Sequence, residues 1–318
     1  MKVLITGANG LIGRSLCTGL EESGCSLIRT VRHACTHGKY AVGHIDGGTD
    51  WGKPLSEAPN VVVHLAAHVH GMQEAEDDAA VLYRQVNTEG TLNLARQCAA
   101  GGVRRFVFLS TVKVLGEGRE EPYHANDPAI PIGPYAISKW EAEQGLQEIA
   151  EHTGMEVVIL RPPLVYGPGA RANFLRMMRT IDKGIPLPFG AIQNRRSLLY
   201  VDNLVDAIRV CLNHPAATGK TYLVSDVDDV STPELIRRMA SALGRPARLL
   251  PVPCRWMRFV GQLLGKQAVV NRLLDSLTVD SQPIREELNW SPPYSMQTGL
   301  VATAEWYRKV KADHATRT

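Results

Sequence analysis

Two residues spaced one helical turn apart could carry out proton transfer. Tyr135 and Lys139 bound the segment YAISK, and a spacing of four places both side chains on one face of a helix. A nearby ammonium group lowers the pKa of a phenol, so Tyr135 could donate or remove a proton at a carbon-bound oxygen near neutral pH. Because a Tyr and a Lys at this spacing also occur by chance, the pair needs support from its surroundings.

Two hydroxyl residues at the end of a predicted strand supply that support. Ser110 and Thr111 directly follow the apolar run 105–109, and Tyr135 comes 24 residues after Thr111. Open α/β sheets bind ligands at the carboxyl ends of their strands, so a hydroxyl there can hydrogen-bond the same substrate oxygen as the phenol. We therefore predict Thr111, Tyr135 and Lys139 as the catalytic group.

A glycine-rich turn lies between the apolar run 3–5 and a predicted helix over 11–23. Glycines there permit a tight turn, bring the backbone close to a pyrophosphate and place the anion at the helix N-terminus. An ordinary strand-to-helix turn is the alternative, but the position in the first strand–helix unit favours dinucleotide binding. The predicted cofactor contacts of this turn are Gly7, Asn9, Gly10, Leu11, Ile12 and Gly13.

The residues after the second predicted strand bear on the choice of dinucleotide. An Asp or Glu at this point would accept hydrogen bonds from the adenosine ribose and repel a 2′-phosphate. The chain has Arg32 there instead, and Arg14 follows the last glycine of the turn. Guanidinium suits phosphate by charge and geometry. We expect NADP(H) to be preferred and NAD(H) to be the alternative if Arg32 faces solvent or stacks on adenine.

Short apolar runs alternate with helical patterns, which is typical of a parallel sheet covered by helices. This alternation predicts an α/β Rossmann fold, a doubly wound parallel sheet with a smaller, discontinuous C-terminal region. The run 221–224 would return to the sheet. The dinucleotide-binding domain would then comprise residues 1–162 and 198–225, and the substrate-binding region residues 163–197 and 226–318.

Composition narrows the class of protein. The 318 residues are 44% hydrophobic and carry a net charge of +3, which argues against binding of nucleic acid through net charge. No apolar run approaches the ~20 residues of a membrane span, and the N-terminus leads directly into a strand, so we expect a cytoplasmic protein without membrane insertion. Neither metal nor disulfides are expected, because the six cysteines are scattered: Cys17, Cys25, Cys35, Cys98, Cys211 and Cys254.

Taken together, these motifs resemble the extended short-chain dehydrogenase/reductase family, of the NAD-dependent epimerase/dehydratase type. Besides the glycine turn, the resemblance rests on HLAA at 64–67, NTEGT at 87–91, Ser110-Thr111, YAISK and RPPLVYGPG at 161–169. It implies that Tyr135 is the general acid/base, that Lys139 tunes it, and that Thr111 positions a sugar oxygen. The cofactor contacts would also include Leu65, Ala66, Ala67, Asn87, Ser110, Tyr135, Lys139 and Pro162. Asn87 could instead be a helix N-cap.

The later motifs resemble the nucleotide-diphosphate site of the same family, which implies a UDP-sugar substrate. Asn173-Phe174 and the segment from Leu187 to Phe189 would enclose a uracil ring, Arg196 would grip the diphosphate, and Asp280 would lie near the ribose. The arginine that usually precedes this last position is absent, since Leu277 and Thr278 stand there. Phe174, Leu187 and Phe189 could equally be core residues.

The residues after Thr111 help to choose the reaction. Sugar-nucleotide dehydratases of the family have an acidic pair there, whereas this chain has Val112 and Lys113, so a 4,6-dehydratase is disfavoured. Over its whole length the chain looks most like the polysaccharide (O-antigen) enzymes that reduce UDP-4-keto-6-deoxy-GlcNAc to UDP-N-acetylquinovosamine. A UDP-hexose or UDP-N-acetylhexosamine 4-epimerase with tightly bound NAD is the alternative, and a non-catalytic NADP-binding sensor is a remote one.

Two predicted helices bear on assembly. In this family the helices over 87–100 and 134–152 pair into a four-helix interface, and here they carry Leu92, Leu94, Trp140 and Leu146. We therefore expect a homodimer, although packing against the sheet would explain the same residues.

Overall fold

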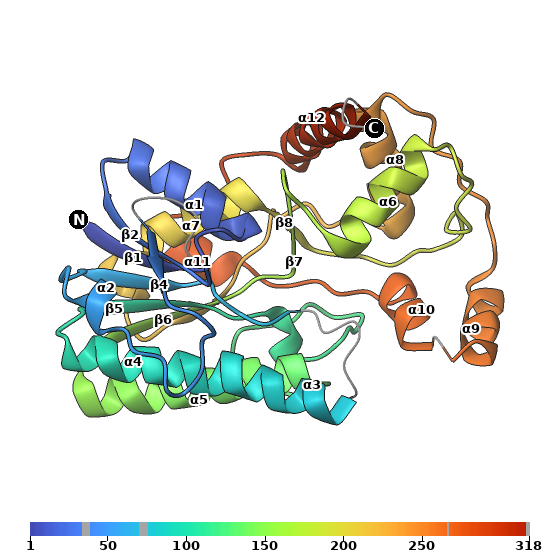
Figure 1. Cartoon of the computed structure of the whole chain (residues 1–318). Helices are drawn as coiled ribbons and strands as arrows, with labels where there is room; N and C mark the ends of the chain where they lie inside the picture. The colour runs from blue at the N-terminus through green and yellow to red at the C-terminus, as the bar shows by residue number, and fades with distance from the viewer. Residues whose placement is uncertain (34–38, 70–75, 266, 316–318) are drawn as a thin grey trace.

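A seven-stranded parallel sheet forms the centre of the part of the chain that the computed structural model describes, residues 1–33, 39–69, 76–265 and 267–315. Its strand order is β3-β2-β1-β4-β5-β6-β9 (Figure 1). The strands are β1 (Lys2–Thr6), β2 (Ser26–Val31), β3 (Lys39–Ala41), β4 (Val61–His64), β5 (Arg105–Leu109), β6 (Glu156–Arg161) and β9 (Thr221–Leu223). Order and direction confirm the predicted doubly wound α/β fold.

Helices cover both faces of this sheet (Figure 1). Val3 and Ile5 of β1 pack with α1 and α7 on one side, whereas Leu4 packs with α4 and α5 on the other. Because the side chains of a strand alternate, burial on both faces explains the continuous apolar runs in the sequence. The helices are α1 (Leu11–Glu22), α2 (Gly52–Leu55), α3 (Glu76–Tyr83), α4 (Gly90–Ala100), α5 (Pro134–Thr153), α7 (Val201–Cys211) and α11 (Gln282–Glu287).

One predicted helix is interrupted. The pattern over 79–100 predicts a single helix, but a π-helical segment, η1 (Arg84–Glu89), separates α3 from α4. A π-helical turn holds one more residue than an α-helical turn. The apolar periodicity does not reveal this extra residue, because the α-helical turns on either side keep the helical pattern. π-segments are frequent at functional sites, and this one contains Asn87.

A smaller group of elements lies beyond the carboxyl ends of the strands (Figure 1). β7 (Leu164–Tyr166) and β8 (Leu198–Tyr200) pair in parallel, and α6 (Ala172–Asp182), α8 (Thr232–Leu243) and α12 (Met296–Ala315) pack around them. Ser231 caps α8, since its hydroxyl accepts from the Glu234 amide at 3.2 Å. The remaining elements are α9 (Cys254–Leu263), α10 (Gln267–Leu274), and the short 3-10 helices η2 (Val112–Val114) and η3 (Pro215–Ala217).

Later features of the chain test further expectations. β9 pairs in parallel with β6, so the chain returns to the sheet where the sequence predicts it.

Two of the residues expected at a dimer interface are core residues. Leu94 and Leu146 are completely buried under the sheet within one chain and cannot form a dimer face. The predicted homodimer interface therefore rests on Leu92 and Trp140. Among the described residues, no helix has the length and apolar character needed to cross a membrane.

Candidate functional site

The fold brings the three predicted catalytic residues to one place at the carboxyl edge of the sheet. Thr111 follows β5 and caps η2, where its hydroxyl accepts from the Lys113 amide at 3.3 Å. Tyr135 lies in the first turn of α5, whose start is set by Pro134 at its first position. The Tyr135 phenol is hydrogen-bonded to the Thr111 hydroxyl. A substrate oxygen placed between them would meet two hydroxyl groups.

The electrostatics of Tyr135 differ from the sequence-based expectation. The pKa of its phenol is raised to about 12, chiefly by burial and next by the nearby Tyr83, with the Thr111 hydrogen bond acting in the opposite direction. The expectation of a lowered pKa is wrong, because desolvation by burial is the largest cause of the shift. The Tyr83 ring lies 6.0 Å from that of Tyr135 in an edge-on arrangement, and both residues are partly buried.

Lys139 is buried beside this phenol. Its side chain is 2% exposed, and its Nζ lies 3.9 Å from the centroid of the Phe108 ring. Desolvation lowers the pKa of Lys139 to about 7, partly offset by the negative charge of Glu143. A buried ammonium group has three N–H donors that water does not satisfy. It is therefore suited to binding a ligand with several oxygen acceptors, such as a ribose.

The buried lysine should make stability depend on pH. The pKa of Lys139 falls from 10.5 to about 7 in the folded chain, so between these values the unfolded chain holds more protons and the free energy of unfolding rises with pH. We expect Lys139→Met to lack about 2 kcal/mol of the rise that the wild-type protein shows from about pH 7 to about pH 9. Urea unfolding at both pH values measures this difference. The exposed Lys183→Met is the control, and a wild-type-like rise in Lys139→Met would contradict the burial argument.

A buried ion pair lies directly behind the lysine, and sequence reasoning missed it. Glu143 is one turn beyond Lys139 on α5 and is completely buried. Its carboxylate accepts from Arg161 Nη2 at 2.6 Å and from Nε at 3.1 Å, and Arg161 Nη1 donates to the Ala125 carbonyl at 2.9 Å. A sequence signal for Glu143 exists, because it follows Lys139 at the same spacing of four residues that separates Lys139 from Tyr135. This spacing places all three side chains on one face of α5. The pair anchors α5 to the end of β6.

The glycine turn has the close packing that a dinucleotide requires. Gly7 has a φ of +68°, and a Cβ there would lie 3.0 Å from the Ala66 amide nitrogen. A Cβ on Gly13 would lie 2.2 Å from the Gly7 carbonyl oxygen, so α1 could not approach the turn with a larger residue. The Gly10 amide closes the turn by donating to the Gly7 carbonyl at 2.9 Å. The exposed backbone before Leu11 therefore fits a pyrophosphate group.

A chain of buried hydrogen bonds connects this turn to the neighbouring strand. Thr6 Oγ1 accepts from the Leu65 and Ala66 amides, both at 3.1 Å, and lies 2.7 Å from His64 Nδ1. His64 Nε2 lies 2.9 Å from Thr91 Oγ1, which donates to the Asn87 carbonyl at 2.7 Å. Burial lowers the pKa of His64 to about 3, so a neutral ring protonated on Nε2 satisfies every contact. The chain positions the 64–67 backbone against the glycine turn.

We expect loss of this histidine to reduce stability. His64→Leu would remove the acceptor of the Thr6 hydroxyl proton and the ring N–H that donates to the Thr91 hydroxyl, which costs about 1–3 kcal/mol of unfolding free energy. Urea unfolding at neutral pH measures the loss. His44→Leu, at an exposed position, should change stability by less than about 0.5 kcal/mol. Equal stability of the two variants would show that the His64 contacts contribute nothing.

The other predicted cofactor residues lie around the same edge. Asn87 accepts from the His68 amide at 2.8 Å and donates to the Ser138 hydroxyl at 3.1 Å, so it is not a helix N-cap and instead joins α5 to the loop after β4. The Ser110 hydroxyl is buried and has no hydrogen-bond partner among the described residues; a ligand would supply one. Asn9 accepts from Lys39 Nζ at 2.8 Å, and Arg32 is exposed at the end of β2. Of the six cysteines, Cys35 lies outside the described residues.

Comparison with known proteins decides the family. A model described as "NAD dependent epimerase/dehydratase family" matches residues 3–225. This chain belongs to that family. The resemblance seen in the motifs is thereby confirmed, and the protein is an NAD-dependent enzyme.

Individual relatives of this epimerase/dehydratase cover nearly its whole length. A UDP-glucose 4-epimerase from Vibrio cholerae is 44% identical over 310 residues, 95% of this chain and 94% of the relative. A solved UDP-glucose 4-epimerase from Thermus thermophilus, in complex with NAD, is 25% identical, with a TM-score of 0.76 over 97% of this chain and 99% of the other. A UDP-glucuronic acid 4-epimerase from Bacillus cereus, in complex with NAD, is 22% identical, with a TM-score of 0.79 and 98% coverage of both chains.

The predicted substrate residues of this epimerase/dehydratase differ in burial and in the contacts that they make within the chain. Phe174 is buried and stacks on Tyr166 at 5.4 Å, within the C-terminal core, so packing accounts for it. Arg196 is held by main chain, since its Nη1 donates to the Arg272 carbonyl at 2.7 Å. Asp280 lies 3.1 Å from His124 Nδ1, and Asn173 is exposed. Leu187 and Phe189 are half-buried against the same core, and Leu187 pairs with the chain near Leu249. Their contacts with substrate stay a prediction.

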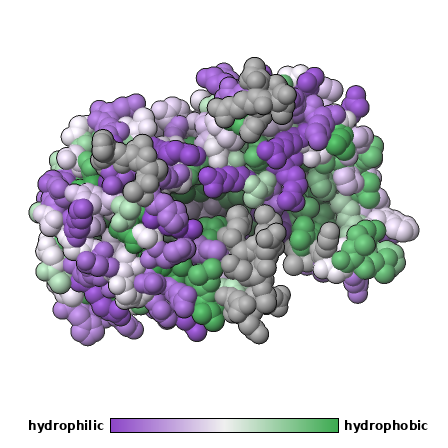
Figure 2. Space-filling view, in the orientation of Figure 1, coloured by the Kyte–Doolittle hydropathy of each residue, from purple (hydrophilic) through white to green (hydrophobic). Residues whose placement is uncertain are grey.

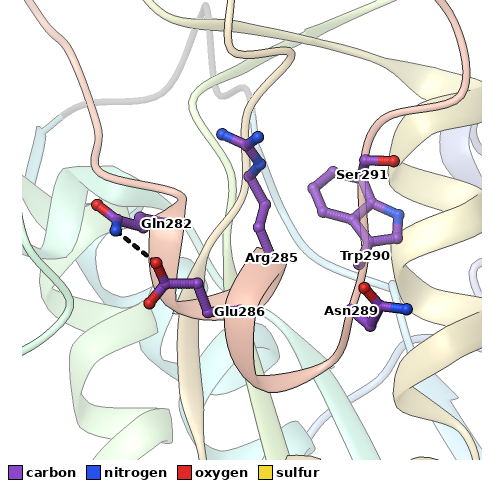
Figure 3. Close-up of a pocket in the computed structure, with 6 residues that line it drawn as sticks. All are labelled: Gln282, Arg285, Glu286, Asn289, Trp290 and Ser291. Atoms are coloured by element: carbon purple, nitrogen blue, oxygen red, sulfur yellow. Dashed lines mark hydrogen bonds between the residues drawn. The ribbon is translucent and has the colours of Figure 1, made fainter.

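A separate pocket lies outside this group of residues. It has a volume of about 350 Å³ and is bounded by α11 and the chain that follows it (Figure 3). None of Thr111, Tyr135 and Lys139 lines it. Figure 3 shows its lining residues: Gln282, Arg285, Glu286, Asn289, Trp290 and Ser291.

Proposed function

We propose that the protein is a UDP-hexose 4-epimerase that keeps NAD bound during turnover. The observation that carries the proposal is the 44% identity to a UDP-glucose 4-epimerase over 95% of this chain. The contact between Thr111 and Tyr135 supports it, because epimerisation at carbon 4 needs a proton acceptor and donor at a single hydroxyl oxygen.

In this proposal the chain's own residues handle the proton on the carbon 4 oxygen. Thr111 would hold that oxygen by a hydrogen bond while the Tyr135 oxygen removes its proton and later returns it. When bound, NAD supplies the hydride acceptor and donor for carbon 4. A phenol with a pKa of about 12 needs positive charge nearby to act as a base, and Lys139 stands one helical turn away to provide it. Burial of Lys139 and partial burial of Tyr135 limit competing water.

The epimerase replaces the reductase as the favoured reaction. The sequence alone favours reduction of UDP-4-keto-6-deoxy-GlcNAc, with the 4-epimerase as the alternative, and the identity to the Vibrio cholerae protein supports the alternative better. The expected preference for NADP has no support, since the two solved relatives named above are complexes with NAD. The exposure of Arg32 at the end of β2 fits the interpretation that it faces solvent above NAD.

The predicted domain division and dimer belong to the same proposal. We propose that residues 1–162 and 198–225 bind NAD and that residues 163–197 and 226–318 bind the UDP group. The return of β9 to the sheet supports this division. A homodimer through α4 and α5 would use Leu92 and Trp140, which are half-buried on those helices.

Two assays on the purified protein test the proposal. With UDP-glucose and no added cofactor, we expect UDP-galactose to form and denatured protein to release one NAD per chain. With UDP-4-keto-6-deoxy-GlcNAc and NADPH or NADH, we expect no stoichiometric loss of nicotinamide absorbance. Oxidation of the reduced cofactor, combined with no epimerisation of UDP-glucose, would overturn the epimerase in favour of the reductase.

A further inference from the structure

The α9–α10 hairpin carries an exposed apolar face. Trp256, Phe259, Val260 and Leu263 follow one another on one side of α9 at helical spacing, and their exposed fractions lie between 47% and 69%. Leu264 and Val269 extend this face across the turn of the hairpin. Figure 2 shows the apolar surface over α9 at the lower right, at the end of the molecule where Figure 1 places the hairpin.

The opposite side of α9 is already occupied by packing. Gly261 is buried, and a Cβ there would lie 2.6 Å from Val270 Cγ2 of α10, so the two helices are in close contact. Two ion pairs hold the hairpin in place. Arg258 of α9 pairs with Asp275, directly after α10, at 3.0 Å, and Arg272 of α10 pairs with Glu117 at 3.2 Å. These contacts leave the apolar face exposed to solvent. Exposed apolar patches of this kind mark sites that bind another molecule or a membrane.

The charged residues of α9 and α10 are all basic. The two helices carry Arg255, Arg258 and Arg272 and no Asp or Glu, in a chain whose net charge is only +3. No acidic side chain pairs with Arg255 in the part of the chain that the structure describes. Arg258 and Arg272 remain more than half exposed despite their ion pairs, and such surface pairs exchange partners at little cost. A second copy of the hairpin would bring like charges together, whereas an anionic surface would attract them.

We propose that the apolar face of the α9–α10 hairpin docks this protein onto an anionic phospholipid surface. Trp256, Phe259 and Leu263 would enter the boundary between headgroups and acyl chains, and Arg255 and Arg258 would lie beside lipid phosphates. A helix with aromatic and leucine side chains on one face and arginines flanking it has the amphipathic pattern of interfacial helices. The docking is peripheral and independent of the reaction assigned to the site.

Vesicle binding by the full chain tests this proposal. The protein is sedimented with vesicles of phosphatidylcholine alone or of phosphatidylcholine mixed with phosphatidylglycerol. We expect binding to the mixed vesicles that weakens with added salt, and a blue shift of tryptophan emission that Trp256→Phe removes while binding persists. Absence of binding, or equal binding to both kinds of vesicle, would overturn the proposal.

Matched variants separate docking from folding. We expect the double variant Phe259→Ser/Leu263→Ser to bind the mixed vesicles at least about tenfold more weakly than wild type. Arg255→Glu should weaken this binding about fivefold. Val301→Ser, at an exposed apolar position on α12, should bind like wild type, and all variants should melt at the wild-type temperature. If sedimentation without lipid shows a dimer that Phe259→Ser/Leu263→Ser abolishes, the face is an interface between copies and the lipid proposal is wrong.

Discussion

Replacement of Tyr135 by Phe should lower the rate of UDP-sugar turnover by about 10²–10⁴-fold while leaving the cofactor bound. The phenol oxygen is hydrogen-bonded to Thr111 and is the group that we propose exchanges a proton with the substrate oxygen. The phenylalanine ring keeps the packing against Tyr83, so the fold and the glycine turn are unaffected. Steady-state turnover and the NAD content of denatured protein measure the two halves of this expectation.

A neighbouring tyrosine provides the matched control. Tyr83→Phe also removes one phenol oxygen, which donates to the Val69 carbonyl at 3.3 Å, but keeps the hydroxyl groups of Thr111 and Tyr135. We expect its turnover to stay within a few-fold of wild type. Retention of more than about a tenth of the activity in Tyr135→Phe would remove Tyr135 from the mechanism.

The largest effect on stability is expected from the buried ion pair behind Lys139. Glu143→Leu leaves the Arg161 guanidinium, whose side chain is 5% exposed, without a negative partner, and an uncompensated buried charge costs about 3–5 kcal/mol. The variant also removes the charge that raises the pKa of Lys139, so the lysine should be less protonated at neutral pH. Urea unfolding measures the first effect.

Two further variants distinguish loss of charge balance from loss of packing. Glu148→Leu, at an exposed position on the same helix, should change stability by less than about 0.5 kcal/mol. The double variant Glu143→Leu/Arg161→Met removes both charges and should recover part of the stability lost in the single variant. A double variant that is less stable than Glu143→Leu would show that packing, and not the stranded guanidinium, determines the cost.

Much of the fold could be predicted because it rests on local patterns. The apolar runs of β1, β4, β5 and β6 are buried on both faces, so their periodicity reports the parallel sheet directly. The glycine turn and the spacing of Tyr135 and Lys139 are equally local, and the structure places them as those patterns require.

What could not be predicted depends on contacts between distant parts of the chain. The pKa of Tyr135 is set by how deeply the phenol is enclosed, which the spacing to Lys139 does not contain. The π-segment around Asn87 is stabilised by contacts with His68 and Ser138, residues that only the fold brings near it. Leu94 and Leu146 have the character of an outer helix face, yet they point to the sheet. Each of these features requires tertiary structure.

Epimerisation of UDP-glucose carrying deuterium on carbon 4 tests the central claim most directly. The account predicts UDP-galactose that retains the deuterium at carbon 4, with none lost to solvent, because the hydride stays on a cofactor that does not leave while Tyr135 exchanges only the proton on oxygen. Mass spectrometry and proton NMR of the product measure the label. Loss of the deuterium to water, or its appearance on free cofactor in solution without any UDP-galactose, would contradict the account.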